Sequence, residues 1–321
     1  MPNQSNHPES RCVVTFWRGD FLETSHDISL VLADESGGVL NFLGNPDLVT
    51  GFRSAAKPFQ AIPIITLPNH EALNISPEEI AICCASHPGT PEHTAFAAAA
   101  LSVSGFNPDD LVCGPAGNPP ACLKHGCSGN HAAILIGAKL LGAKLHGYQL
   151  PDHPIQIYIT NLMKELTGAP EVHIAIDGCG VPSFGVRIRE MATAYAALNG
   201  AGSKYTKITG AMTSFPHLIG ANRGIDVGII MATQGRLIAK TGAEGLLCIG
   251  YPGAGRGVAI KCHDGTFAAI GVVGLRFLIQ IGWMTEAEVE HQSLSKWWRN
   301  AEEPKSANGY CRVEIQPYQI D

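Results

Sequence analysis

Strand-type sequence near both ends of the chain limits the folds that it can adopt. Apolar runs of strand length, bounded by Gly and Pro, occupy residues 28–33, 39–43, 236–241, 245–250, 257–262 and 309–316. Glu35-Ser36-Gly37-Gly38 joins the first two as a hairpin, while Ala-rich helical patterns dominate the stretch between the two groups. Strands that must pair across a long helical insertion predict an α+β fold. We expect an antiparallel sheet flanked by helices, with an inserted, mostly helical subdomain.

The chain is predicted to form one large domain. Its 321 residues can bury a sizeable core, and 45% hydrophobic against 16% charged residues indicates a globular protein. Residues 1–10 are polar and are expected to form a disordered lead-in to a domain spanning 11–321. The sheet parts are predicted at about 11–75 and 226–321, and the helical part at about 76–225.

Charge and hydropathy exclude some partners. The net charge is −6 and no cluster of Lys and Arg occurs, which argues against a nucleic-acid partner. No apolar run reaches the roughly 18 residues needed to cross a bilayer, so no membrane partner is expected. The polar N-terminus lacks the apolar segment of a signal peptide, and ten cysteines in that context read as reduced thiols or metal ligands. We therefore expect a cytoplasmic protein.

Ser54 and Lys57 are the first candidates for chemistry. Three residues apart on a helix, they share one face, and an amine there can take the proton of a serine hydroxyl. Lys240-Thr241-Gly242 follows far downstream. Ser-x-x-Lys followed by Lys-Thr-Gly is the signature of serine acyl-transfer enzymes that use lysine as the base. The alternative for each half is structural: Ser54 as a helix N-cap, and Lys240 as an exposed residue on a turn.

Other polar residues sit in turns and glycine-rich loops. Ser86 follows the buried apolar run 80–85, and Cys127 and Cys179 each lie among glycines. The two cysteines could bind zinc, which accepts thiolate and imidazole ligands. Cys127 could also be a nucleophile activated by His125 or His131. Spacing alone leaves these alternatives open.

Taken together, the motifs resemble one family, the class 3 or Rhizobium etli-type L-asparaginases, whose fold is similar to that of serine β-lactamases and glutaminases. The likeness runs from about Arg18 to the C-terminus. It rests on five ordered motifs: Arg53-Ser54-x-x-Lys57, Ala85-Ser86-His87, Cys127-Ser128-Gly129-x-His131, Asp177-Gly178-Cys179-Gly180-x-Pro182 and Ala239-Lys240-Thr241-Gly242-Ala243.

The resemblance implies two serine–lysine pairs. Ser54 would be the nucleophile with Lys57 as its base, and Ser86 would pair with Lys240 to relay protons. The backbone N–H groups of Ser54 and Ala243 would form the oxyanion hole. The same likeness places three further side chains at the substrate or metal site: Arg53, His131 and Asp177.

The resemblance also implies a zinc ion and a homodimer. The family holds zinc with two cysteines and a lysine, which match Cys127, Cys179 and, in the lysine position, Asn130. An amide oxygen is a poorer zinc ligand than an amine, so we expect zinc binding to be weakened here.

The implied reaction is hydrolysis of the side-chain amide of L-asparagine to L-aspartate and ammonia through an acyl-enzyme. Two alternatives stay open. The same site could act on glutamine or another small amide, since one methylene changes discrimination by only about 1–3 kcal/mol. The chain could instead be a non-catalytic binding protein with a degraded metal site. Ammonia release from asparagine separates these readings.

Overall fold

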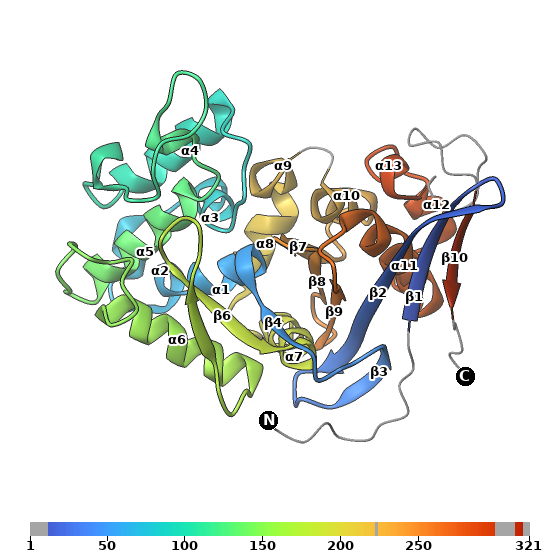
Figure 1. Ribbon diagram of the computed structural model, residues 1–321. Coiled ribbons are helices and arrows are strands. Elements are labelled where there is room, and N and C mark those ends of the chain that lie inside the picture. The colour runs from blue at the N-terminus through green and yellow to red at the C-terminus, as the bar shows by residue number, and fades with distance from the viewer. Residues whose placement is uncertain (1–11, 222–223, 299–311, 317–321) are drawn as a thin grey trace.

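The computed structural model describes residues 12–221, 224–298 and 312–316. The expected lead-in at 1–10 lies outside the described residues, as does the start of the last predicted strand. In Figure 1 a large sheet occupies one half of the molecule and a cluster of helices the other. Among the described helices, none is both long and apolar enough to cross a membrane.

The large sheet is antiparallel and has seven strands in the order β10-β1-β2-β9-β8-β7, with β3 also paired to β2. The strands are β1 (Cys12–Arg18), β2 (Phe21–Asp34), β3 (Val39–Leu43), β7 (Ile238–Gly242), β8 (Leu246–Tyr251), β9 (Arg256–Cys262) and β10 (Arg312–Gln316). The first and last parts of the chain therefore meet in one sheet, where Ile28 of β2 lies opposite Cys262 of β9. The predicted α+β fold is confirmed.

Helices cover both faces of this sheet. A Cβ atom added to Gly257 would strike the backbone of α7 (Ile188–Leu198), while Ile260 contacts Gly274 of α11 (Phe267–Gln280). Side chains three positions apart on a strand point to opposite faces, so α7 and α11 enclose the sheet. This explains why β9 is buried along almost its whole length.

Most of the remaining chain is helical. The other α-helices are α1 (Lys57–Gln60), α2 (Pro63–Thr66), α3 (Pro77–Cys83), α4 (Pro91–Ser102), α5 (Ser128–Leu140), α6 (Pro154–Thr167), α8 (Thr206–Ser214), α9 (Pro216–Ile219), α10 (Ile225–Ala232), α12 (Glu286–Val289) and α13 (Ser295–Trp298). Short 3-10 helices occur at η1 (Arg53–Ala56), η2 (His70–Leu73), η3 (Pro108–Asp110) and η4 (Cys122–Lys124). Ser54 and Lys57, which were expected on one helix, thus lie in η1 and at the first position of α1.

A second, smaller sheet lies between the two halves and was not expected from the sequence. It has the order β4-β6-β5, formed by β4 (Val49–Gly51), β6 (Pro182–Arg187) and β5 (His173–Ile176). Two of its strands come from the segment predicted to be mostly helical. Its first strand leads directly into η1, so this sheet helps to position the chain at Ser54 (Figure 1).

Local sequence signals define the start of α3, the helix that leads to Ser86. Ser76 and Glu79 form a capping box at the start of α3, with Pro77 at the first position of the helix. The buried face of α3 then packs against α5, because Gly129 approaches the carbonyl of Ile82 so closely that a Cβ atom would lie 2.1 Å from it. This contact fixes the end of α3, from which the chain runs to Ser86.

Candidate functional site

Ser54 lies in the 3-10 helix η1, directly before α1. In a 3-10 helix, side chains three positions apart lie above one another, so Ser54 and Lys57 share one side. The buried Tyr195 hydroxyl donates a hydrogen bond of 2.9 Å to the carbonyl of Ala55 and holds this turn. Ser54 itself is only partly buried, so its hydroxyl can be reached from outside.

The residue before Ser54 has an unusual backbone conformation. Arg53 has φ +48°, in the left-handed region that costs energy for a non-glycine residue. Its guanidinium donates two hydrogen bonds to Asp177, from Nε to Oδ2 at 3.2 Å and from Nη2 to Oδ1 at 3.0 Å. This pairing raises the pKa of Arg53. The two predicted substrate-site residues are thus in contact, and their ion pair helps to hold the strained turn.

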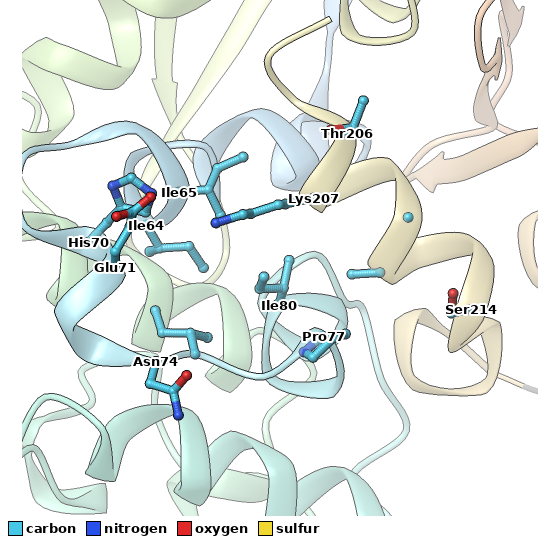
Figure 2. A pocket seen from close by; sticks show the side chains of 13 residues that line it. Ile64, Ile65, His70, Glu71, Asn74, Pro77, Ile80, Thr206, Lys207 and Ser214 are labelled. Atoms are coloured by element: carbon cyan, nitrogen blue, oxygen red, sulfur yellow. The ribbon is translucent and has the colours of Figure 1, made fainter.

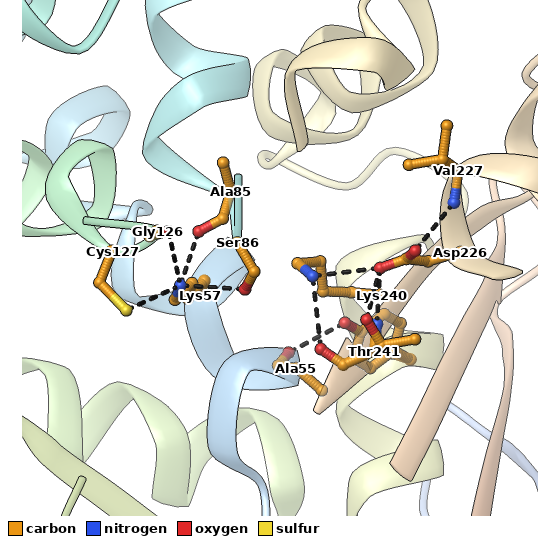
Figure 3. A network of polar contacts seen from close by, with 11 residues as sticks. Ala55, Lys57, Ala85, Ser86, Gly126, Cys127, Asp226, Val227, Lys240 and Thr241 are labelled. Carbon is orange, nitrogen blue, oxygen red and sulfur yellow. Dashed lines mark hydrogen bonds and ion pairs between the residues drawn. The ribbon is translucent and has the colours of Figure 1, made fainter. Parts of the chain in front are cut away.

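Lys57 is buried at the centre of a polar cluster (Figure 3). Its Nζ donates to Ser86 Oγ at 3.0 Å and to the carbonyl of Ala85 at 2.6 Å. The carbonyl of Gly126 and the sulfur of Cys127 lie 3.4 and 3.3 Å from the same nitrogen. Four acceptors thus surround this one amine nitrogen. Lys57 therefore links the end of α3 to the loop before α5.

The hydrogen-bonded serine–lysine pair differs from the two pairs expected. Within residues 12–221 and 224–298, no hydrogen bond joins Ser54 to Lys57 or Ser86 to Lys240; the observed pair is Lys57 with Ser86. The physical reason is local. The Lys57 amine extends to the carbonyl at the end of α3, and the Lys240 amine is held by a carboxylate.

That carboxylate belongs to Asp226, the second residue of α10. Lys240 is fully buried, and its Nζ lies 3.1 Å from Asp226 Oδ2. The same oxygen accepts from the backbone N–H of Thr241 at 3.0 Å and from its hydroxyl at 2.7 Å. Burial lowers the pKa of Lys240 against the attraction of Asp226. Burial opposes ionisation of Asp226 too, but Lys240 and Thr241 overcome it and lower the pKa of the carboxyl.

The Lys-Thr-Gly segment lies beside η1. A Cβ atom on Gly242 would lie only 2.8 Å from the carbonyl oxygen of Phe52, two residues before Ser54. Glycine is therefore required for β7 to approach η1 so closely. Ala243 follows in the turn between β7 and β8. The two halves of the sequence signature, nearly 200 residues apart, are in contact.

Cys127 and Cys179 also come together. The side chains of Cys179 and Cys127 interact, and this contact, Lys57 and His125 lower the pKa of Cys127 despite its burial. The pKa of Cys179 is correspondingly raised, because it would share the site with a thiolate and is buried. The amine of Lys57, 3.3 Å from the sulfur of Cys127, thus favours the thiolate form of this cysteine. The described cysteines are all free of disulfides.

Comparison with known proteins now identifies the family. The family model described as L-asparaginase II matches residues 14–311, which is most of the chain. The chain belongs to the L-asparaginase II family. The members of this family are amidohydrolases, and the resemblance seen in the sequence motifs is confirmed. No curated protein matches the chain.

Similar solved structures are distant. A crystal structure of Mglu in its native form is 16% identical with a TM-score of 0.49, over 84% of this chain and 66% of that one. Mglu in its glutamate form is 15% identical with a TM-score of 0.49, over 80% and 61%. A β-lactamase from Mycobacterium bovis is 10% identical with a TM-score of 0.37, over 81% and 95%. This chain therefore spans less than two thirds of the length of the Mglu chains.

Asn130 and His131 lie at the start of α5, next to the cysteine pair. The Asn130 Nδ2 donates a long bond of 3.4 Å to the carbonyl of Cys83, while its buried Oδ1 has no hydrogen-bond partner. His131 Nδ1 pairs with the hydroxyl of Tyr148 at 2.7 Å, and its Nε2 is buried without a partner. Burial lowers the pKa of His131 to about 4, so the ring is neutral at pH 7.

These residues do not fit a zinc site closed by four protein ligands. Within the described parts of the chain, no His, Cys, Asp or Glu completes a set of three with Cys127 and Cys179. Structural zinc sites in proteins are almost always four-coordinate. Two thiols and one amide oxygen leave the set incomplete, and Lys57 already contacts one sulfur.

Sequence reasoning missed three residues that hold this site: Asp226, Tyr195 and Tyr148. Asp226 carried a usable signal, since it is the one charged residue in the apolar run 225–232, and a buried carboxylate needs a partner. The two tyrosines carried none, because a tyrosine in an apolar pattern reads as ordinary core.

A separate hollow of about 550 Å³ lies between α2, α3 and α8 (Figure 2). Ile65, Ile80 and Lys207 line it, and none of the predicted site residues does. It is distinct from the cluster around Lys57.

Proposed function

We propose that this protein hydrolyses the side-chain amide of L-asparagine to L-aspartate and ammonia, with Ser54 as the nucleophile. The observation that carries the proposal is the close contact of Gly242 with Phe52, which sets the Lys-Thr-Gly strand beside the turn holding Ser54. Family membership supports amide hydrolysis, and the buried lysines on either side of η1 support proton transfer at this serine.

In this mechanism the Ser54 oxygen attacks the amide carbon while its proton passes to the Lys57 amine. The hydrogen bond from Lys57 to Ser86 extends the proton path toward the leaving nitrogen. The carbon–nitrogen bond breaks, the nitrogen takes the proton and leaves as ammonia, and an ester on Ser54 remains. Water then hydrolyses the ester to aspartate.

The oxyanion would be stabilised by the backbone N–H groups of Ser54 and Ala243. Outside the helix and strand ladders, neither group donates to a backbone carbonyl of the described residues. Free N–H groups near a nucleophile are what an oxyanion hole requires. Arg53 and Asp177 are assigned to substrate binding, and His131, neutral at pH 7, to the same wall of the site.

Replacement of the nucleophile tests the proposal. Ammonia release from asparagine and from glutamine is measured for the wild type, Ser54→Ala and Ser36→Ala. Ser36 lies in an exposed turn and serves as the control. We expect Ser54→Ala to lower kcat by at least about 10³-fold, because the acyl-enzyme cannot form, and Ser36→Ala to change nothing.

Three other results would change the assignment. An undiminished rate in Ser54→Ala means that another group is the nucleophile. Activity on glutamine alone would make the enzyme a glutaminase, and a wild type inactive on both amides would favour the binding-protein reading. A cytoplasmic location and a homodimer remain predictions made from the sequence.

We also propose that zinc binding at Cys127 and Cys179 is weak in this chain. The support is the incomplete ligand set and the buried, unpartnered Oδ1 of Asn130. Asn130→Lys restores the family's amine, and Asn130→Leu removes the polar ligand as a matched control. We expect zinc to survive mild chelation at this site only in Asn130→Lys. Retention of a full equivalent at the cysteine pair in the wild type would contradict the proposal.

A further inference from the structure

A second group of side chains that could bind a metal lies at the C-terminal end of β9, away from Lys57. His26, Cys262 and Asp264 have one ligand atom each within 4.8 Å of the others, the only such trio among the described residues. His26 belongs to β2, Cys262 ends β9, and Asp264 lies in the turn before α11. None of them is used by the mechanism above.

The sheet brings these three side chains to one face. Ile28 lies opposite Cys262, and the ladder continues because the N–H of His263 donates to the carbonyl of Asp27 at 2.9 Å. His26 is two residues from Ile28, and Asp264 is two residues beyond Cys262. Since side chains two apart on a strand share a face, the register itself assembles the trio.

The distances between the ligand atoms are suitable for a metal. His26 Nδ1 lies 2.6 Å from Asp264 Oδ2, and Cys262 Sγ lies 3.0 Å from Asp264 Oδ1. Metal–ligand distances of about 2.0–2.3 Å place the ligands of a tetrahedral zinc about 3.4 Å apart. Only shifts of less than about 1 Å would be needed to admit an ion.

Hydrogen bonds to other residues also orient two of the candidate ligands. The other ring nitrogen of His26, Nε2, lies 3.0 Å from the hydroxyl of Thr24. The carboxylate of Asp264 accepts from the backbone N–H of Thr266 at 2.9 Å. Metal-binding histidines almost always use their second nitrogen in this way, and such partners fix the ring and the tautomer.

We propose that His26, Cys262 and Asp264 form a binding site for zinc. Imidazole, thiolate and carboxylate together suit zinc better than magnesium or calcium, which prefer oxygen ligands. The ion would displace the thiol hydrogen of Cys262, which passes to solvent, and the ring hydrogen on Nδ1 of His26, which moves to Nε2 where the Thr24 hydroxyl accepts it. Three protein ligands leave the fourth position to water, and the side chain of Asp264, 46% exposed, provides the way in.

The site would tie together two turns. The N–H of Cys262 donates to the carbonyl of Gly245 at 2.9 Å, and a Cβ atom on Gly245 would lie 2.7 Å from the backbone of Gly265. The turn after β9 therefore packs on the turn between β7 and β8. An ion that holds the first turn stabilises the second through this contact.

Metal titration of the full-length protein tests the proposal. The protein is stripped with a chelator, incubated with zinc or cobalt, and passed through gel filtration. Bound metal is counted by elemental analysis, and cobalt by its thiolate charge-transfer band in the near ultraviolet. The variants are Cys262→Ser and His26→Gln, with Cys248→Ser as the control because it removes another buried thiol of the same sheet. Cys127→Ser reports on the separate cysteine pair.

We expect Cys262→Ser and His26→Gln each to lose one equivalent of metal relative to the wild type and Cys248→Ser to lose none. Thr24→Val, which removes only the partner of His26, should weaken binding about 10- to 100-fold. Zinc should also raise the melting temperature of the wild type but not of His26→Gln, a comparison that holds if Cys262→Ser fails to fold. Equal metal content in the wild type, Cys262→Ser and His26→Gln, or loss in Cys127→Ser alone, overturns the proposal.

Discussion

At the scale of single residues, Asp226 determines where the amine of Lys240 can go. One carboxylate oxygen accepts from that amine and from both the backbone and the hydroxyl of Thr241. A buried ion pair gains its specificity from such additional hydrogen bonds rather than from attraction alone. Asp226 is thus a positioning residue that acts on the site through Lys240.

Asp226→Asn tests this role. Removing one partner leaves Lys240 buried and uncompensated, which should lower the free energy of unfolding by about 3–5 kcal/mol. A misplaced Lys240 should also lower kcat by about 10²-fold with little change in KM. Urea unfolding and steady-state kinetics measure the two effects. The control is Glu288→Gln, which breaks a more exposed pair with Arg236 and should cost less than about 1 kcal/mol. Equal losses in both variants would count against the role of Asp226.

His87 gives a second prediction, for pH dependence. Burial lowers its pKa to about 3, whereas an unfolded histidine titrates near 6.5. The unfolded chain therefore binds a proton first as the pH falls. The stability due to this group is complete above about pH 6.5 and decreases by about 1.4 kcal/mol per pH unit between about pH 6 and pH 3.

The measurement is urea unfolding of the wild type and His87→Gln from pH 8 to pH 4. We expect the wild type to lose stability more steeply than the variant below pH 6, while the two slopes agree above pH 7. Parallel slopes over the whole range would mean that His87 takes up its proton at the same pH in the folded and the unfolded protein.

At the scale of elements, the position of the turn that carries Ser54 depends on the contact between β7 and η1. Gly242 allows it, because any Cβ there would press on the carbonyl of Phe52. A shift at this point moves the turn that carries Ser54. Small displacements of a nucleophile are costly, since catalysis requires near-attack geometry.

Gly242→Ala should therefore lower kcat and destabilise the fold by about 1–3 kcal/mol through overpacking. The matched control is Gly210→Ala in α8, where a Cβ atom meets nothing within 4 Å. That change should be neutral or stabilise by up to about 1 kcal/mol. Ammonia release and thermal melting of both variants check the pair. If Gly242→Ala behaves like Gly210→Ala, the contact with Phe52 is not what holds η1.

At the scale of the whole molecule, most of the main sheet was predictable from the sequence, whereas β1 and the small sheet were not. The β2–β3 hairpin and the β7–β8–β9 meander follow from apolar runs bounded by turn residues. The sequence analysis missed β1, although its buried Cys12, Val14 and Phe16 alternate as a strand requires. It also missed β6, because this strand begins with Pro182 and contains a glycine, both of which weaken a strand pattern.

The sequence motifs named the residues of the candidate site, but they did not indicate the hydrogen-bond partners of those residues. Motif order singled out Ser54, Lys57, Ser86 and Lys240 without any knowledge of contacts. Which amine meets which hydroxyl depends on the end of α3 and on Asp226, and both are set by packing between segments far apart in the sequence. Spacing along one helix carries no information about such contacts.

The carboxylate of Asp226 also binds a backbone group at the edge of the main sheet. β7 is the last strand in the order, and the N–H of Thr241 faces away from β8 toward the position that another strand would occupy. Asp226 already accepts from that N–H, and α10 covers the same side. An exposed strand edge invites pairing with a second molecule. The group that fixes Lys240 thus also occupies a hydrogen-bond donor at the edge of the sheet, and this disfavours pairing of that edge with a second molecule beside the turn that carries Ser54.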